Sequence, residues 1–270
     1  MTGPAGVSRF AAVVLTGGAG RRMGGVDKPA LPVAGRSMRE RVLAAVSDAE
    51  PRVVVGTTEG LPPGVHGVRE RPAGGGPVAA TAAGLALLIM AGTPDGSTAT
   101  EEGAADDAST ATEIDAVDGN AAVDAGTVTE MRAVDGSAAD NAGTATEIGA
   151  VDGRGVATVA LLAADLPLLT AAAVRELRTA LERVPDADGV VYLDDAGRPQ
   201  WLCGVWRVAP LRRALGRLAA RRDGVLTGAS VRTLMAELTV AELAWRGSGP
   251  PPWFDCDTDE DLRRAEEWIR

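Results

Sequence analysis

Residues 13–29, VVLTGGAGRRMGGVDKP, form the stretch of this chain best suited to bind an anion. Glycines let backbone N–H groups approach a phosphate closely, and nearby cations add charge. Among the 27 lysine and arginine residues of the chain, Lys28 is the only lysine. The loop fits neither the Walker pattern, because Pro29 follows the lysine, nor the dinucleotide pattern, because Met23 replaces its third glycine. Composition alone leaves two interpretations open: a phosphate site, or a glycine-rich turn with solvated arginines.

The other reactive residue types are scarce. The single histidine, His66, excludes a multi-histidine zinc site and argues against a Ser-His-Asp hydrolase. Cys203 and Cys256 are far apart and lack metal-ligand spacing, so we expect two buried free thiols. Any chemistry must therefore use carboxylates, backbone amides, arginines and Lys28. Asp165, at the end of an apolar stretch, is one such carboxylate, although it could also only cap the turn that follows.

The negative charge of the chain is concentrated in residues 95–153. This segment holds 14 of the acidic residues against one arginine, whereas the whole chain has a net charge of −10, so the remainder is mildly basic. A basic remainder suits a phosphate-rich ligand. The segment repeats TATEIDAVDG-like units at 17-residue spacing and contains few large apolar residues, which favours a disordered insertion. Weak calcium binding by its Asp-Gly pairs is the alternative, although they lack the spacing of a calcium loop.

Outside this segment, strand-like and helix-like stretches alternate. We expect strands within 9–16, 51–57 and 156–167, two strands around a turn at 195–197, and helices within 37–46, 76–92, 170–184 and 257–270. Thr170 is a plausible cap of its helix, and Thr258 with Asp261 forms a capping-box pattern. Such alternation predicts an α/β fold with a mostly parallel sheet and helices on both faces. Ligands of such sheets bind at the carboxyl ends of the strands, where the glycine loop and Asp165 both fall.

Five stretches of the chain, in order, resemble the MobA-like nucleotidyltransferases. LTGGAGRRMGGVDK is similar to the glycine loop of that family, and its ending is most like the loops of guanylyltransferases that act on molybdopterin. The remaining four are RERPAGGGPVAATAAGL, LLAADLPLL, GRPQWLCGVW and FDCDTDEDLRRA. The resemblance implies a three-layer Rossmann-like nucleotidyltransferase fold, with residues 1–270 as a single domain interrupted by 95–153. Trp201 and Asp259 replace prolines of the family pattern, and Trp201 bears on how the acceptor is recognised.

The resemblance also implies roles for individual residues. Leu15, Thr16, Gly17 and Gly18 would bind the nucleotide through the backbone, and Glu70 would lie near its base. Lys28 and Arg22 would contact the phosphates, and Asp165 would bind both the nucleotide and Mg²⁺, with Asp257 completing the metal site. From the residues alone, Asp255 and Asp257 could equally be ordinary acidic residues ahead of a helix N-terminus, where negative charge is favourable.

The implied reaction is the Mg²⁺-dependent transfer of GMP from GTP to the phosphate of molybdopterin, the organic part of the molybdenum cofactor. Alternatives are a related transferase that uses CTP or another phosphorylated acceptor, and a nucleotide-binding module without catalysis. Partners would be these substrates, together with molybdoenzymes or proteins that insert the cofactor. We expect no nucleic-acid partner. We also expect no membrane association, because no apolar run approaches the length of a bilayer span. We expect a cytoplasmic location, because no A-x-A-like cleavage site follows the short apolar segment near the start of the sequence, which instead continues into the glycine loop.

Overall fold

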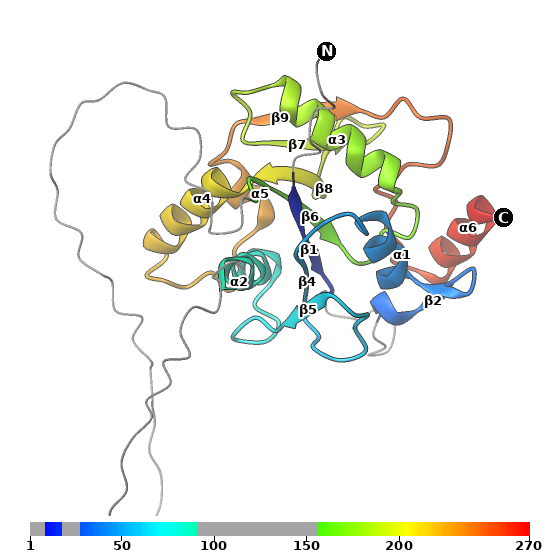
Figure 1. Ribbon diagram of the computed structural model, residues 1–270, viewed down its shortest axis with the longest axis horizontal. Helices are drawn as coiled ribbons and strands as arrows, with labels where there is room; N and C mark the ends of the chain where they lie inside the picture. Colours follow the sequence, from blue (N-terminus) through cyan, green and yellow to red (C-terminus); the bar gives the residue numbers. More distant parts are fainter. Residues whose placement is uncertain (1–8, 18–27, 91–155) are drawn as a thin grey trace, which may run out of the picture. The chain divides into compact units, whose positions relative to one another are not determined.

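The computed structural model describes residues 9–17, 28–90 and 156–270, which are built around one seven-stranded sheet (Figure 1). Its strands are β1 (Phe10–Leu15), β4 (Arg52–Val55), β5 (Val65–Val68), β6 (Thr158–Ala163), β7 (Gly189–Leu193), β8 (Pro199–Arg207) and β9 (Val240–Ala244). They lie in the order β5-β4-β1-β6-β8-β7-β9, and every neighbouring pair is parallel except the two that include β8. The predicted mostly parallel sheet is confirmed.

Six α-helices lie among the described residues: α1 (Met38–Ala45), α2 (Pro77–Met90), α3 (Ala171–Arg183), α4 (Val208–Ala220), α5 (Val231–Met235) and α6 (Asp259–Ile269). The predicted caps are confirmed, because Thr170 Oγ1 accepts from the Ala173 N–H and Thr258 forms a capping box with Asp261. A 3-10 turn, η2 (Lys28–Ala30), precedes the small hairpin β2 (Pro32–Val33) and β3 (Arg36–Ser37).

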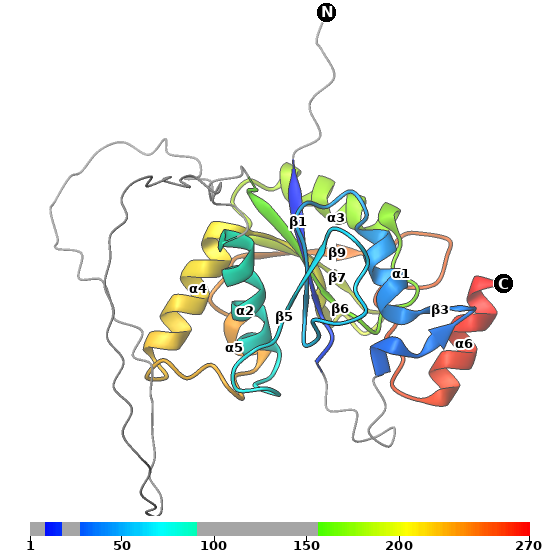
Figure 2. The same ribbon diagram turned by 60° about the horizontal axis from the view of Figure 1, so that its bottom comes forward.

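Helices cover both faces of the sheet (Figure 2). Helices α1 and α3 pack on the face that carries Phe10, Ala12 and Val14, while α2, α4 and α5 cover the face of Ala11 and Val13. Because β1 is central and buried on both faces, all six of its residues are apolar, which is the pattern of an interior parallel strand. The layers therefore fix β1, and with it the start of the glycine loop.

A third, smaller apolar cluster lies beneath α6. It contains Val33 of the hairpin, Met38, Leu168, Cys256 and Ala265. Both Cys256 and Cys203 are buried free thiols, as expected. This cluster attaches the carboxyl-terminal segment to the part of the chain that follows β6.

The predicted acidic insertion, residues 95–153, lies outside the described residues. The helix before it is confirmed as α2 and the strand after it as β6. That both belong to one domain interrupted by this segment stays a prediction. Within the described residues, no helix combines the length and apolar character required to cross a membrane.

Candidate functional site

The carboxyl ends of β1 and β6 meet at the point where the chain reverses its order across the sheet. From β1 the chain proceeds outward to β4 and β5, and it then returns to the opposite side of β1 as β6. Such a reversal leaves a crevice beyond the strand ends, where ligands bind in open α/β sheets. Thr16 and Gly17 follow β1, and Asp165 lies two residues after β6, so these predicted site residues fall at this position.

The end of β1 is held by its two neighbours. The carbonyl of Leu15 accepts from the Ala164 N–H at 2.9 Å, while the N–H and Oγ1 of Thr16 both donate to the Val55 carbonyl, at 2.9 and 2.7 Å. The Thr16 side chain also lies against Gly56, where a Cβ would collide with Oγ1. The N–H of Thr16 thus already donates a hydrogen bond within the protein. Thr16 therefore ends the pairing of β1 with β4, and Gly17 follows it at the start of the glycine loop.

Glu70 lies beside this strand end. Its side chain is buried, Oε1 accepts from the Gly74 N–H at 3.0 Å, and the same oxygen is the nearest atom to a Cβ built on Gly17, at 3.8 Å. Just ahead of α2, the carbonyl of Gly75 accepts a hydrogen bond from the Gly228 N–H. The structure therefore brings Glu70 and Gly17 together, as their predicted common role requires.

Lys28 lies between two carboxylates that are distant in sequence. Its Nζ donates to Asp165 Oδ2 at 2.6 Å and to Asp257 Oδ1 at 2.7 Å. The Lys28 side chain is only 15% exposed, against 25% for Asp165 and 53% for Asp257. Burial disfavours the charged ammonium, but the hydrogen bonds to the two carboxylates and the attraction of their negative charges together outweigh it, so the pKa of Lys28 lies above its ordinary value. Lys28 is therefore a cation at neutral pH, held in place by the two residues predicted to bind metal.

Asp257 reaches this place because of its neighbours. The buried side chain of Cys256 packs in the third apolar cluster, and its N–H donates to the Asp165 carbonyl at 3.2 Å. On the other side, Asp261 Oδ2 accepts from the N–H groups of Asp257 and Thr258 at the start of α6. One buried residue and one helix cap thus fix the backbone on both sides of Asp257.

Asp255 joins the same group of charges. Partial desolvation, together with the carboxylates of Asp257 and Asp165, raises the pKa of Asp255, which retains substantial solvent exposure. The sequence indicated for this residue only an ordinary acidic side chain ahead of a helix N-terminus. The Asp-Cys-Asp alternation was the available signal, because burial of the central residue directs both flanking carboxylates away from the core.

Two of the predicted site residues, Gly18 and Arg22, lie outside the described residues. Their roles stay predictions. His66, the only histidine of the chain, is exposed on the edge strand β5.

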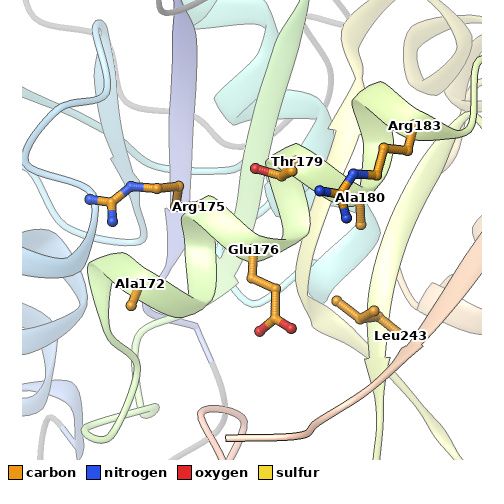
Figure 3. Close-up of a pocket in the computed structure, with 7 residues that line it drawn as sticks. All are labelled: Ala172, Arg175, Glu176, Thr179, Ala180, Arg183 and Leu243. Atoms are coloured by element: carbon orange, nitrogen blue, oxygen red, sulfur yellow. The ribbon is translucent and has the colours of Figure 1, made fainter.

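A surface pocket of about 360 Å³ lies elsewhere, between α3 and β9 (Figure 3). It is lined by Ala172, Arg175, Glu176, Thr179, Ala180, Arg183 and Leu243. Glu176 is held there by the buried Tyr192, whose hydroxyl donates to it at 2.9 Å. Of the predicted nucleotide and metal residues that the structure describes, none lines this pocket, which is therefore separate from the candidate site.

Comparison with known proteins identifies a family for this chain. Residues 12–239 match the family model described as the MobA-like NTP transferase domain. A 47-residue stretch is 53% identical to the molybdenum cofactor guanylyltransferase of Acidiphilium cryptum (strain JF-5). That stretch covers 17% of this chain and 24% of the relative, so the match spans about a quarter of the relative's length.

Solved structures share the fold over nearly the whole chain. Molybdopterin-guanine dinucleotide biosynthesis protein A from Archaeoglobus fulgidus superposes with a TM-score of 0.56 at 16% identity, covering 96% of this chain and 97% of its own. The 4-diphosphocytidyl-2C-methyl-D-erythritol synthase from Anaerococcus prevotii gives 0.51 at 11% identity, with coverages of 97% and 99%. At such identities these likenesses establish the nucleotidyltransferase fold. The family model spans most of the sequence, and the chain therefore belongs to the MobA-like NTP transferase family.

Proposed function

We propose that this protein transfers GMP from GTP to the phosphate of molybdopterin, in a Mg²⁺-dependent reaction that forms molybdopterin guanine dinucleotide and releases pyrophosphate. The observation that carries the proposal is the cluster of Lys28, Asp165 and Asp257 at the carboxyl end of the sheet, next to the end of β1. The family match and the short identical stretch with a molybdenum cofactor guanylyltransferase support it.

The reaction needs charge neutralisation more than proton transfer. A phosphate oxygen of the acceptor attacks the α-phosphorus of GTP, a new P–O bond forms, and the bond to the bridging oxygen breaks as pyrophosphate leaves with the electron pair. Because the acceptor phosphate is already ionised near pH 7, no general base is needed. The exposed position of His66 on an edge strand is compatible with this chemistry. What remains is to bring two anions together, which positioned cations and backbone N–H groups achieve.

Each residue of the site has a part in this proposal. The backbone at Leu15–Gly17 binds the nucleotide, and Glu70 lies beside Gly17 where it contacts the base. The ammonium of Lys28 neutralises phosphate oxygens. Its compact charge on a flexible stem suits a crowded triphosphate better than the planar fork of an arginine. This accounts for a lysine at the one position where the chain uses it.

The carboxylates fit Mg²⁺ in their chemistry. Among the described residues, no three histidine, cysteine or acidic side chains converge as a complete metal cage. Mg²⁺ does not need one, because it keeps several waters and binds through one or two carboxylates together with substrate phosphates. Asp165 and Asp257 supply these oxygens. When bound, the ion would neutralise charge on the triphosphate as a Lewis acid.

Titration calorimetry tests the donor. GTP, CTP, ATP and UTP are compared in the presence of Mg²⁺, with Asp165→Asn as the test variant and Asp259→Asn, an exposed aspartate of α6, as the matched control. The Asp165 change spares the backbone carbonyl that accepts from Cys256. We expect GTP to bind best, the Asp165 variant to lose most of this affinity, and the control to retain it.

Turnover then tests the acceptor. Pyrophosphate release from GTP should require both molybdopterin and Mg²⁺. Preference for CTP would assign the protein to a cytidylyl branch, with the fold and metal site unchanged. Binding without pyrophosphate release in the presence of molybdopterin would contradict the proposed reaction and favour another acceptor or a module without catalysis.

A further inference from the structure

The two carboxylates predicted to bind metal are occupied by a side chain of the protein itself. Lys28 Nζ lies 2.6 Å from Asp165 Oδ2 and 2.7 Å from Asp257 Oδ1. These are short, charge-assisted hydrogen bonds, and they use one oxygen of each carboxylate. A divalent cation held by Asp165 and Asp257 would compete with the ammonium for these carboxylates.

We propose that Lys28 is an internal counter-ion that hinders metal binding until a nucleotide triphosphate draws it away from Asp165 and Asp257. The inference rests on the proposed function, since it takes these residues as the Mg²⁺ and phosphate ligands. It adds a rule for the order of events: the free protein binds divalent metal weakly, and metal and nucleotide bind with positive coupling.

The charges of the site explain why a counter-ion is present at all. Asp165 and Asp257 both lie within hydrogen-bond distance of one ammonium, so their two carboxylates converge on the same point, and Lys28 pairs with both of them. Without a cation these carboxylates would repel one another. The ammonium therefore stabilises the empty site, and it does so at the expense of metal affinity.

The backbone of Lys28 allows its side chain to change partners. Its carbonyl accepts from the Leu31 N–H at 3.0 Å, and the next residue, Pro29, is buried in η2. The Cα is therefore anchored while four methylene groups separate it from the charge, which permits a swing of the ammonium without movement of the fold. A triphosphate offers more negative charge than the two carboxylates. Its arrival moves the ammonium to the phosphates and frees the carboxylate oxygens for metal.

Mn²⁺ binding followed by electron paramagnetic resonance tests this inference without turnover. Wild type is titrated alone and with GTP or CTP, alongside Lys28→Met, which keeps the apolar stem and removes the charge. Arg263→Met, an exposed arginine of α6, is the matched control for loss of one positive charge near the site. Thermal melts followed by circular dichroism verify folding, and Lys28→Gln replaces the methionine variant if that one does not fold.

We expect Lys28→Met to bind Mn²⁺ without nucleotide at least about tenfold more tightly than wild type, which lies within the usual range of site coupling. The nucleotide should then improve its Mn²⁺ affinity far less than it does in wild type. Equal or weaker binding by Lys28→Met, or a gain no larger than that of Arg263→Met, would overturn the inference while leaving the metal site in place. Absence of protein-bound Mn²⁺ in every sample, after subtraction of the Mn²⁺ that the nucleotide binds in protein-free controls, would overturn the proposed metal site itself.

Discussion

Replacement of Lys28 by arginine keeps the positive charge and changes the size and shape of the group that carries it. In the structure the ammonium fits between two oxygens at 2.6 and 2.7 Å with its side chain 15% exposed. A guanidinium is larger and planar, so it cannot take this position without displacing a carboxylate. We expect Lys28→Arg to lose at least one of its charge-assisted contacts with the phosphates in the transition state.

The size of the effect follows from that contact. A hydrogen bond to a charged group contributes about 1.5–3 kcal/mol. Because about 1.4 kcal/mol corresponds to a factor of ten in rate, the expected loss is roughly 10- to 150-fold in kcat. The melting temperature should change by only a few degrees, because the positive charge beside Asp165 and Asp257 is conserved and partly exposed ion pairs contribute about 0–1 kcal/mol.

The assay is pyrophosphate release at saturating GTP, Mg²⁺ and molybdopterin. Arg221→Lys serves as the matched control, because it also exchanges the two basic residue types, in an exposed ion pair with Glu237. The control should keep wild-type turnover. Near-wild-type kcat in Lys28→Arg would refute the argument from shape. A change confined to KM would refute it as well, since that pattern indicates binding shared by ground and transition states.

Three further predictions concern the scaffold. Gly84→Ala in α2 should destabilise the protein by about 1–3 kcal/mol in urea unfolding, because its Cβ would lie 2.6 Å from Val13 Cγ1 and 3.0 Å from Val55 Cγ2. Gly216→Ala in α4, where no atom lies within 4 Å of the added Cβ, should instead stabilise the protein by about 0.5–1 kcal/mol. Equal changes in the free energy of unfolding for the two variants would contradict the packing argument. Cys203 and Cys256 should resist thiol reagents at pH 8 until the protein is unfolded. Burial raises the pKa of both thiols to about 12, and the reactive thiolate forms only as the pH rises towards that value. Rapid labelling of the native protein would disprove this. Replacement of residues 95–153 by a short Gly-Ser linker should leave pyrophosphate release intact, since long loop segments contribute little to stability; a folded but inactive deletion variant would show that the segment has a functional role.

Much of the fold could be predicted from local pattern. The apolar run of β1, the caps at Thr170 and Thr258, and the helix within 76–92 rest on signals that act over a few residues, and each was confirmed. β5 was not predicted, because its four residues, VHGV, include an exposed histidine and a glycine and carry no strand pattern. It forms because it pairs with β4.

The pairing of the later strands is another feature beyond local pattern. The two strands around the turn at 195–197 were predicted, and they form the hairpin β7–β8. The second strand, β8, inserts between β6 and β7, with β9 outside. That order depends on which apolar faces meet across the sheet, so residues far apart in sequence decide it.

The sequence by itself determined which residues could do the chemistry: a glycine loop ending in the only lysine, and carboxylates at Asp165 and Asp257 within recognisable motifs. Tertiary structure alone decided that these three side chains meet, since Lys28 is 137 residues from Asp165 and 229 from Asp257. It did so through a reversal of strand order that joins β1 to β6, and through the burial of Cys256, which attaches Asp257 beside them. Local sequence specifies propensity and chemistry, whereas contacts between distant segments arise only when a common core buries them together.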